Sequence, residues 1–306
     1  MSRARGLLGA TTAGAVAAGV TRLAYTVLNQ RAPGGTKAWS RTNHRGEPVT
    51  LLEGPAVAVG AIAGALAQAT LGPMRSGPAR SGAAMALAGA GAAAFGGYDD
   101  LAGSGDRRGF RGHLGALRQG EVTTGAIKLG GIGVTGLASA AMAGGSPADI
   151  AINAGLVAGG ANLLNLFDLR PGRAIKVALG SSALIAAGGA LAGNGASSAE
   201  CVAPAAGAAV ALLPDDLGER AMLGDGGANA LGAMLGAAAA VSLPRPARLA
   251  LLAGIAGLTA ASEKVSFTKV IAATPALHWL DMLGRRPAAP AQAPIVKIPV
   301  PAQPEE

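Results

Sequence analysis

The amino-acid sequence predicts an all-α, polytopic integral membrane protein with about nine transmembrane helices. Its 306 residues are 50% hydrophobic and only 14% charged, whereas an average soluble domain is about one quarter charged. The mean hydropathy of the chain is +0.41. The apolar residues also gather in stretches near the ~20 residues that cross a bilayer. Together these observations exclude an ordinary soluble enzyme and a disordered chain.

Nine apolar stretches are candidate membrane spans. Small residues dominate them, and small residues let membrane helices approach closely where lipid gives no hydrophobic driving force. Glycines spaced four residues apart are therefore candidate helix contacts, unless they only reflect a biased composition. The predicted spans are residues 6–28, 54–72, 81–97, 125–144, 148–165, 174–193, 197–213, 227–243 and 247–262. The glycine pairs are Gly60/Gly64, Gly155/Gly159 and Gly232/Gly236.

The chain divides into three parts by composition. Residues 1–265 form the polytopic membrane domain, residues 266–284 an amphipathic segment at the membrane interface, and residues 285–306 a Pro-rich flexible tail in the cytoplasm. Arg3 and Arg5 before the first apolar stretch leave a signal peptide as an alternative. Because Cys201 is the single cysteine, neither a disulfide framework nor a Cys-based zinc site can form.

The basic residues predict the orientation of the spans. Of the 25 Lys and Arg, 16 lie in the gaps after the odd-numbered spans and 6 on the other side. Basic residues favour the cytoplasm. We therefore expect a plasma-membrane protein with its amino terminus outside the cell and its carboxyl terminus in the cytoplasm. The net charge of +8 then indicates contact with anionic lipid or substrate; no basic patch with interleaved aromatic residues points to nucleic acid.

The acidic residues are distributed even more unevenly. Of 17 Asp and Glu, only Asp149 and Glu200 fall on the predicted outer side. The positive-inside rule makes no statement about acidic residues, so this asymmetry needs another cause. A solvated loop surface is one explanation. A functional site at the inner face is the other, and it is favoured because several acids stand at span ends.

Two polar motifs end predicted spans on the inner side. Asp99 and Asp100 follow the third span, where one carboxylate can hold a cation while the other takes a proton. Asn162, Asn165 and Asp168 form one stripe at the end of the fifth span, and their oxygens suit a hard cation such as Mg²⁺. The structural alternatives are a helix end followed by a turn for the first motif, and capping or interhelical hydrogen bonds for the second.

Further inner-side residues suit phosphate chemistry. Asp225 begins the eighth span in a Gly-rich segment, where free N–H groups favour phosphate oxygens; an N-cap is the alternative. Lys128 would hold a diphosphate or merely snorkel, and Arg170 and Arg173 would meet phosphate. Carboxylates, amides, Lys and Arg on one membrane face are the groups needed for Mg²⁺-assisted phosphoryl transfer.

Taken in order, these motifs resemble those of the polyprenyl-phosphate N-acetylhexosamine-1-phosphate transferases, the superfamily that includes phospho-N-acetylmuramoyl-pentapeptide transferase (MraY). The resemblance spans residues 43–232 and combines the first inner loop, an aspartate pair, an Asn-x-x-Asn-x-x-Asp motif and a Gly-Asp-x-Gly motif. The segments are Asn43-His44-Arg45-Gly46-Glu47-Pro48, Gly97-Tyr98-Asp99-Asp100, Asn162-Leu163-Leu164-Asn165-Leu166-Phe167-Asp168 and Leu223-Gly224-Asp225-Gly226-Gly227-Ala228-Asn229-Ala230-Leu231-Gly232.

The resemblance implies an MraY-like fold and a Mg²⁺-dependent enzyme of cell-wall (peptidoglycan-type) glycan biogenesis. Such an enzyme transfers a sugar-1-phosphate, by the family resemblance N-acetylhexosamine-1-phosphate, from a UDP-sugar to polyprenyl phosphate and releases UMP. By this analogy Asp225 and Asn165 would hold Mg²⁺. Asp99 and Asp100 would position or deprotonate the lipid phosphate, with Asp225 the third catalytic residue. Lys128 would neutralise the diphosphate.

The remaining expectations concern substrates and partners. The substrate-binding residues would be Lys128, Asn162, Asp168, Arg170 and Arg173. The expected partners are undecaprenyl-type polyprenyl phosphate, a UDP-sugar and the lipid bilayer, without nucleic acid, and a homodimer is left open. The active site would face the cytoplasm.

The sequence departs from the family at two places. Pro171 stands where the family often has a second aspartate, and Ser266-Phe267-Thr268-Lys269 with a lone His278 replaces a His-rich last loop. These departures keep two alternatives open. One is a catalytically degenerate relative that binds a lipid or a partner, and the other is a transporter with an ion site on the cytoplasmic side.

Overall fold

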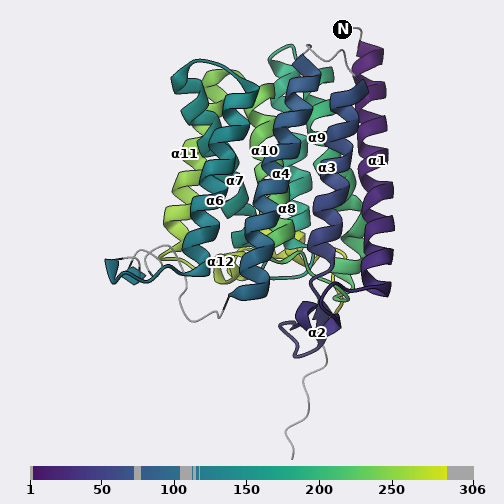
Figure 1. Cartoon of the computed structure of the whole chain (residues 1–306), viewed down its shortest axis with the longest axis vertical. Coiled ribbons are helices and arrows are strands. Elements are labelled where there is room, and N and C mark those ends of the chain that lie inside the picture. The colour runs from purple at the N-terminus through teal and green to yellow at the C-terminus, as the bar shows by residue number, and fades with distance from the viewer. Residues whose placement is uncertain (1–2, 72–76, 104–111, 113–114, 117, 288–306) are drawn as a thin grey trace, which may run out of the picture.

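The computed structural model of the protein is an almost entirely helical bundle (Figure 1). It describes residues 3–71, 77–103, 112, 115–116 and 118–287. In this part of the chain, nine helices of 18 residues or more coincide with the nine predicted apolar stretches. They are α1 (Arg3–Gln30), α3 (Glu53–Leu71), α4 (Gly77–Ala102), α6 (Thr124–Ala143), α7 (Pro147–Phe167), α8 (Arg173–Leu191), α9 (Gly195–Leu217), α10 (Gly224–Ser242) and α11 (Arg245–Ser262).

Fewer of the described helices qualify as membrane spans, by their length and apolarity, than the nine that the sequence predicts. Five described helices, α1, α6, α7, α8 and α9, are long and apolar enough to cross a bilayer. The pair α11 and α12 (Phe267–Ala273), bent by 97° at a short break, raises this number to six if it counts as one span. The prediction of nine spans is therefore not confirmed, although an all-α protein with several candidate spans is.

Helix α10 occupies the centre of the bundle. It contacts α3, α4, α6, α7, α8 and α9, and every one of its residues except Asp225 and Val241 is buried. A helix that is apolar on all sides belongs in the interior of a bundle. This position places the amino terminus of α10, and with it Asp225, among the ends of the surrounding helices.

The predicted glycine pairs do lie at helix contacts. A Cβ atom at Gly64 would come within 2.7 Å of the carbonyl oxygen of Ala13 in α1. Gly232 faces the backbone of Gly160, and Gly236 faces the backbone of Leu156. These close backbone approaches join α3 to α1 and α10 to α7, which is the packing expected where small residues line membrane helices.

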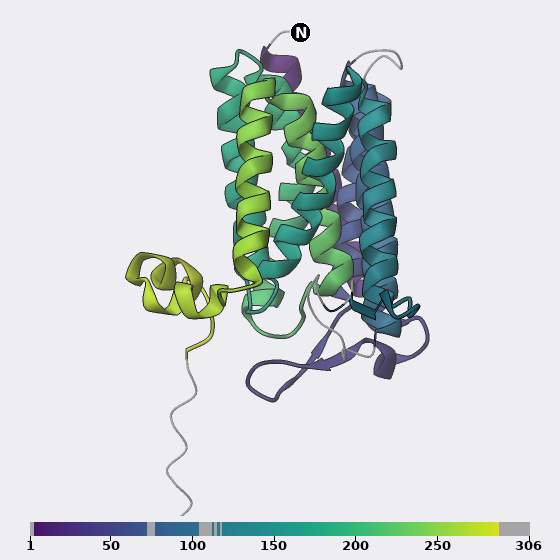
Figure 2. The ribbon, with the colours of Figure 1, turned by 90° about the vertical axis from the view of Figure 1, so that its left-hand side faces the viewer.

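The short elements all lie at one end of the bundle, opposite the end where α1 begins (Figures 1 and 2). They are α2 (Thr36–Trp39), the antiparallel strands β1 (Ser40–Thr42) and β2 (Pro48–Thr50), α12 and α13 (Pro275–Met282). We call this end the loop end. The predicted interfacial segment 266–284 thus forms two short helices, whereas most of the predicted tail, from residue 288 on, lies outside the described residues.

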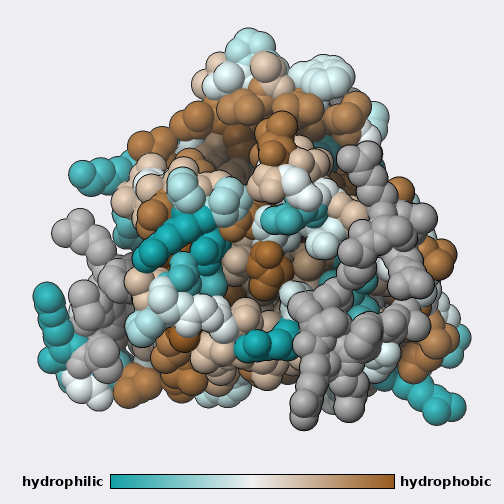
Figure 3. Space-filling view, turned by 90° about the horizontal axis from the view of Figure 1, so that it is seen from above, coloured by the Kyte–Doolittle hydropathy of each residue, from teal (hydrophilic) through white to brown (hydrophobic). Residues whose placement is uncertain are grey.

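The surface of the long helices is largely apolar. Large exposed side chains include Leu8, Leu23, Val134, Leu184 and Leu191. In a view along the bundle from its other end, hydrophobic residues occupy much of the rim and hydrophilic residues gather over the end of the helices (Figure 3). An apolar belt with polar ends is the surface expected of a protein that lies in a membrane.

Candidate functional site

Three side chains from three helices meet at the loop end. The ammonium of Lys128 in α6 lies 2.6 Å from an oxygen of Asp99 in α4 and 2.5 Å from an oxygen of Asp225 in α10. The three side chains are only 14–26% exposed. Thr124, at the start of α6, adds a hydrogen bond to Asp99. We call Asp99, Asp100, Lys128 and Asp225 the carboxylate–lysine cluster.

Asp100 fixes the amino terminus of α10. Its two carboxylate oxygens accept hydrogen bonds from the backbone N–H groups of Asp225, at 3.0 Å, and Gly226, at 2.8 Å. These are N–H groups that a helix start leaves without internal partners. Burial, followed by the negative charge of Asp225, raises the pKa of Asp100 to about 6. Asp100 therefore positions Asp225 rather than pointing freely at a substrate.

Glycines permit the close approach of these helix ends. A Cβ atom at Gly96 in α4 would clash with the carbonyl oxygen of Asp225, and one at Gly54 in α3 would clash with the carbonyl oxygen of Leu223. Gly224 has φ 61°, in the left-handed region that glycine adopts readily. The Gly-rich segment around Asp225 thus brings the start of α10 against both neighbouring helices.

The predicted motif at the end of α7 is divided between several contacts. The amide of Asn162 donates to the hydroxyl of Thr259 in α11 at 3.3 Å, which is the interhelical hydrogen bond that was the alternative for this residue. Asp168 accepts a hydrogen bond from the backbone of Gly224, beside the cluster. Burial raises the pKa of Asp168 well above its usual range, and the charges of Asp216 and Asp225 add to this effect. Asn165 precedes Asp168 by one turn.

The two predicted phosphate-binding arginines lie apart from the cluster. Arg173 is buried and donates to both oxygens of Asp281, at 2.7 and 3.0 Å, and to the hydroxyl of Thr268. Arg170 donates to the carbonyl oxygen of Leu169. The structure therefore gives Arg173 a role in holding the carboxyl-terminal helices, and its guanidinium is already neutralised there.

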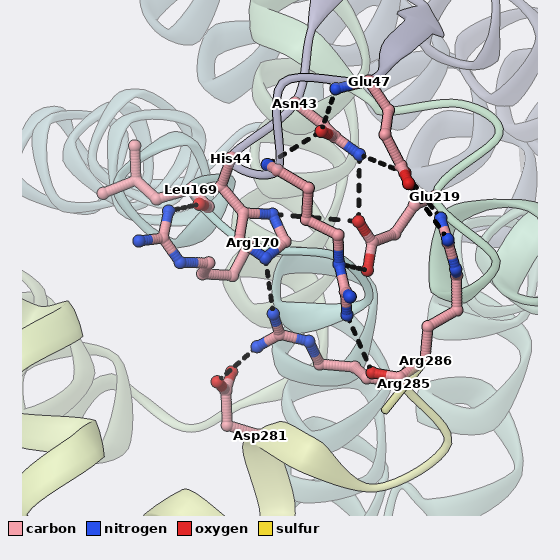
Figure 4. A network of polar contacts seen from close by, with 10 residues as sticks. Asn43, His44, Glu47, Leu169, Arg170, Glu219, Asp281, Arg285 and Arg286 are labelled. Atoms are coloured by element: carbon pink, nitrogen blue, oxygen red, sulfur yellow. Dashed lines mark hydrogen bonds and ion pairs between the residues drawn. The ribbon is translucent and has the colours of Figure 1, made fainter. Parts of the chain in front are cut away.

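A polar cavity of about 280 Å³ opens beside Asp168. The loop between α1 and α3 and the ends of α7 and α9 line it, with Asn43, His44, Arg170 and Glu219 among the lining residues. The side chain of Glu219 is fully covered, and its two oxygens accept hydrogen bonds from Asn43 and the Arg45 guanidinium, each 2.9 Å long (Figure 4). Asp216 also lines the cavity and is 2% exposed, and one of its carboxylate oxygens has no hydrogen-bond partner among the described residues.

Sequence reasoning missed three residues near the cluster. Arg41, in β1, donates to the backbone carbonyl of Asp100, and Thr124 was not singled out. Glu53, at the start of α3, is 0% exposed, and neither of its carboxylate oxygens has a hydrogen-bond partner among the described residues. The one available signal was that Glu53 is an acid directly before an apolar stretch, a position that a helix N-terminus also explains.

The cluster offers oxygen ligands that a hard cation prefers, but not a preformed metal site. Among the described residues, no group of three or more His, Cys, Asp or Glu side chains has the arrangement of a metal site. Lys128 already forms ion pairs with the two carboxylates that a cation would use. Mg²⁺, however, is commonly held by one or two carboxylates together with water and substrate phosphates. Asp225 offers a carboxylate for that mode, while Asn165, one turn before Asp168, stays a predicted ligand.

Comparison with known proteins adds no family to these findings. A scan against protein-family models finds no match to the chain, and a search of curated proteins finds no relative. The resemblance to the sugar-phosphate transferases therefore stays a prediction that depends on the motifs.

Proposed function

We propose that the protein is a membrane enzyme that transfers a sugar-1-phosphate from a UDP-sugar to polyprenyl phosphate. The group that we propose first is N-acetylhexosamine-1-phosphate. An oxygen of the lipid phosphate forms a bond to the β-phosphorus of the UDP-sugar. The bond from that phosphorus to the bridging oxygen breaks, and UMP leaves with this oxygen. The product is a lipid-linked sugar diphosphate, as in cell-wall glycan synthesis at the cytoplasmic face of the plasma membrane.

The single observation that supports this proposal most is the position of the carboxylate–lysine cluster at the end of an apolar bundle. A reaction between a lipid phosphate and a water-soluble nucleotide needs polar groups at such a boundary. Lys128 carries the one ammonium of the cluster, and a diphosphate would compete with Asp99 and Asp225 for it. The two carboxylates released from Lys128 and the added diphosphate would then need a further cation, which is the role proposed for Mg²⁺.

The other groups of the cluster have positioning roles. Asp99 and Asp100 orient the lipid phosphate, Asp100 through its hold on the start of α10. The lipid phosphate is largely anionic near neutral pH, since a phosphomonoester has its second pKa near 6, so a strong base is not required. Bound Mg²⁺, held by Asp225 and Asn165, would supply charge neutralisation on the phosphate oxygens.

An apolar cavity of about 170 Å³ supports the lipid half of the proposal. It lies between α7, α8, α10 and α11, and its lining includes Leu163, Leu184, Leu235 and Ile255. Apolar surface of this kind suits a prenyl chain, which buries its carbons at a gain of about 25 cal/mol per Å².

The test is a screen of nucleotide-sugars for Mg²⁺-dependent UMP release by the purified protein in the presence of polyprenyl phosphate. The Asp225→Asn variant is expected to lose the activity because it removes the charge that both Lys128 and a cation require. His278→Ala, an exposed change in α13, is the matched control and should keep it. Absence of UMP with every UDP-sugar would favour a degenerate lipid- or partner-binding relative, and metal-independent ion flux in liposomes would favour a transporter.

A further inference from the structure

The last two described helices run across the direction of the bundle. Helix α12 is bent by 97° from α11, so it lies along the membrane surface when the bundle axes stand along the membrane normal. Figure 2 shows α12 and α13 packed together, crosswise at one side of the foot of the bundle. A helix pair that lies across the bundle axis at the end of the bundle is typical of the membrane–water interface and not of a membrane span.

One face of this helix pair is fixed to the bundle. Asp281 in α13 is buried between Arg173 and Arg285, with ion pairs of 2.7 and 2.8 Å. The ammonium of Lys176 donates to the carbonyl oxygens of Leu280 and Asp281, at 3.0 and 2.7 Å. The ring of Phe267 stacks on that of Phe167, at the end of α7, with centroids 5.3 Å apart. The polar side of α13 is therefore used inside the molecule.

The opposite face of α13 is apolar and uncovered. Trp279 is 63% exposed, Leu280 is 50% exposed and Leu283 is 53% exposed. Leu283 directly follows α13, four residues after Trp279 and on the same side, while Asp281 between them points the other way. Three large apolar side chains in one patch indicate an interaction surface, whereas single exposed apolar residues are common on any protein.

The surroundings of this patch identify its partner. Arg285 and Arg286 are paired with Asp281 and Glu47, but Lys264 and Lys269 are exposed, just before and within α12, and exposed basic side chains favour anionic lipid headgroups. Trp is enriched at membrane–water interfaces. We propose that α12 and α13 form an interfacial foot, with the face of Trp279, Leu280 and Leu283 seated in the headgroup layer of the bilayer that the bundle spans.

The interfacial foot also touches the first inner loop. Arg286 forms an ion pair of 2.6 Å with Glu47, and the Arg45 guanidinium donates to the carbonyl oxygen of Arg286 at 2.9 Å (Figure 4). The side chain of Arg285 reaches His44, which lines the polar cavity. The interfacial foot is therefore bonded to the loop that lines the cavity.

The chain offers a direct test, because Trp39 and Trp279 are its two tryptophans. Trp39→Phe leaves Trp279 as the reporter, and Trp279→Phe leaves Trp39, in α2, as the matched control. The full chain is placed in nanodiscs of phosphatidylcholine and phosphatidylglycerol, with bromine on the acyl chains next to the headgroup. Emission of Trp279 is expected to lose most of its intensity to the brominated lipid and little to aqueous iodide, with the opposite order for Trp39.

Quenching of Trp279 by iodide without quenching by the brominated lipid would overturn the proposal. Protection of Trp279 from both quenchers would also overturn it, because protein would then cover the patch. The inference rests on a membrane-embedded bundle and not on catalysis. A positive quenching result without UMP release would therefore contradict only the proposed transfer reaction.

Discussion

At the scale of single residues, one ammonium serves two carboxylates, because Lys128 contacts both Asp99 and Asp225. The choice of Asp99, Lys128 and Asp225 followed from charged residues at predicted span ends, and the structure brings these three together. The pairing of Arg173 with Asp281 was not predictable, because 108 residues separate them and either side chain alone reads as a surface charge. A charged residue at a helix end can be recognised in the sequence, whereas its ion-pair partner depends on how the helices pack.

Replacement of Lys128 by Met tests the electrostatics of the cluster. The variant leaves Asp99 and Asp225 close together without a cation, and loss of one partner of a buried pair costs about 3–5 kcal/mol. We expect a clearly lower thermal unfolding temperature in metal-free buffer. Lys37→Met, at an exposed residue of α2, is the control. Equal unfolding temperatures for both variants would show that the ion pairs do not form.

At the scale of helices, the small-residue pattern predicted contacts more reliably than it predicted membrane crossing. The glycine pairs lie where helices touch, because only hydrogen at Cα lets backbones approach this closely. The division of 266–284 into α12 and α13 was not predicted, since an amphipathic pattern does not specify where a helix breaks. The position of β1 and β2 was also missed, because strands of three residues leave no periodicity.

Gly232→Ala probes the contact of α10 with α7. The new methyl group would collide with the backbone of Gly160, and overpacking of this kind costs about 1–3 kcal/mol. Gly180→Ala in α8 adds the same methyl group where no atom lies within 4 Å. Thermal unfolding in detergent should show a loss for the first variant and no loss for the second. The opposite order would contradict the packing of the central helix.

The pH dependence of α13 follows from Asp281. Burial raises the pKa of this carboxyl, but the hydrogen bond from Arg173 and the charges of Arg173 and Arg285 outweigh burial, and the pKa lies below its usual value. A depressed pKa stabilises the docked helix above about pH 4, the unfolded value, and this contribution is lost as the pH falls through the folded pKa. The protection of residues 275–282 from hydrogen exchange, corrected for the intrinsic exchange rate at each pH, should therefore fall in acid below about pH 4.

The Asp281→Asn variant supplies the control for this prediction. This variant lacks the titrating group. The protection of α13 from hydrogen exchange should therefore already be low near neutral pH and should change little in acid. A steep acid transition that persists in this variant would assign the pH dependence to another residue.

At the scale of the whole molecule, polar groups concentrate at one end of an apolar bundle. Charge distribution along the sequence predicted this segregation, and Asp149 and Glu200 do stand at the starts of α7 and α9, away from the loop end. The number of spans was not predictable from apolar length alone. Helices such as α10 are covered by protein on all sides, and helices of Ala and Gly need not face lipid to be apolar.

Accessibility of engineered cysteines tests the orientation. In a Cys201→Ala background, Ala148→Cys lies in the first turn of α7 and Lys37→Cys lies at the loop end. A membrane-impermeant maleimide should label Ala148→Cys in intact cells and Lys37→Cys only after lysis. Labelling of both positions in intact cells, or the reverse order, would contradict an inner loop end.

The most direct test of the proposed function is the stoichiometry of the transfer reaction. Purified protein in nanodiscs, with polyprenyl phosphate, Mg²⁺ and the best UDP-N-acetylhexosamine from the screen, should form UMP and lipid-linked sugar diphosphate in equal amounts, and Asp225→Asn should form neither. Formation of UMP without the lipid product, or equal yields from wild type and Asp225→Asn, would contradict the assignment of the carboxylate–lysine cluster as the site of transfer.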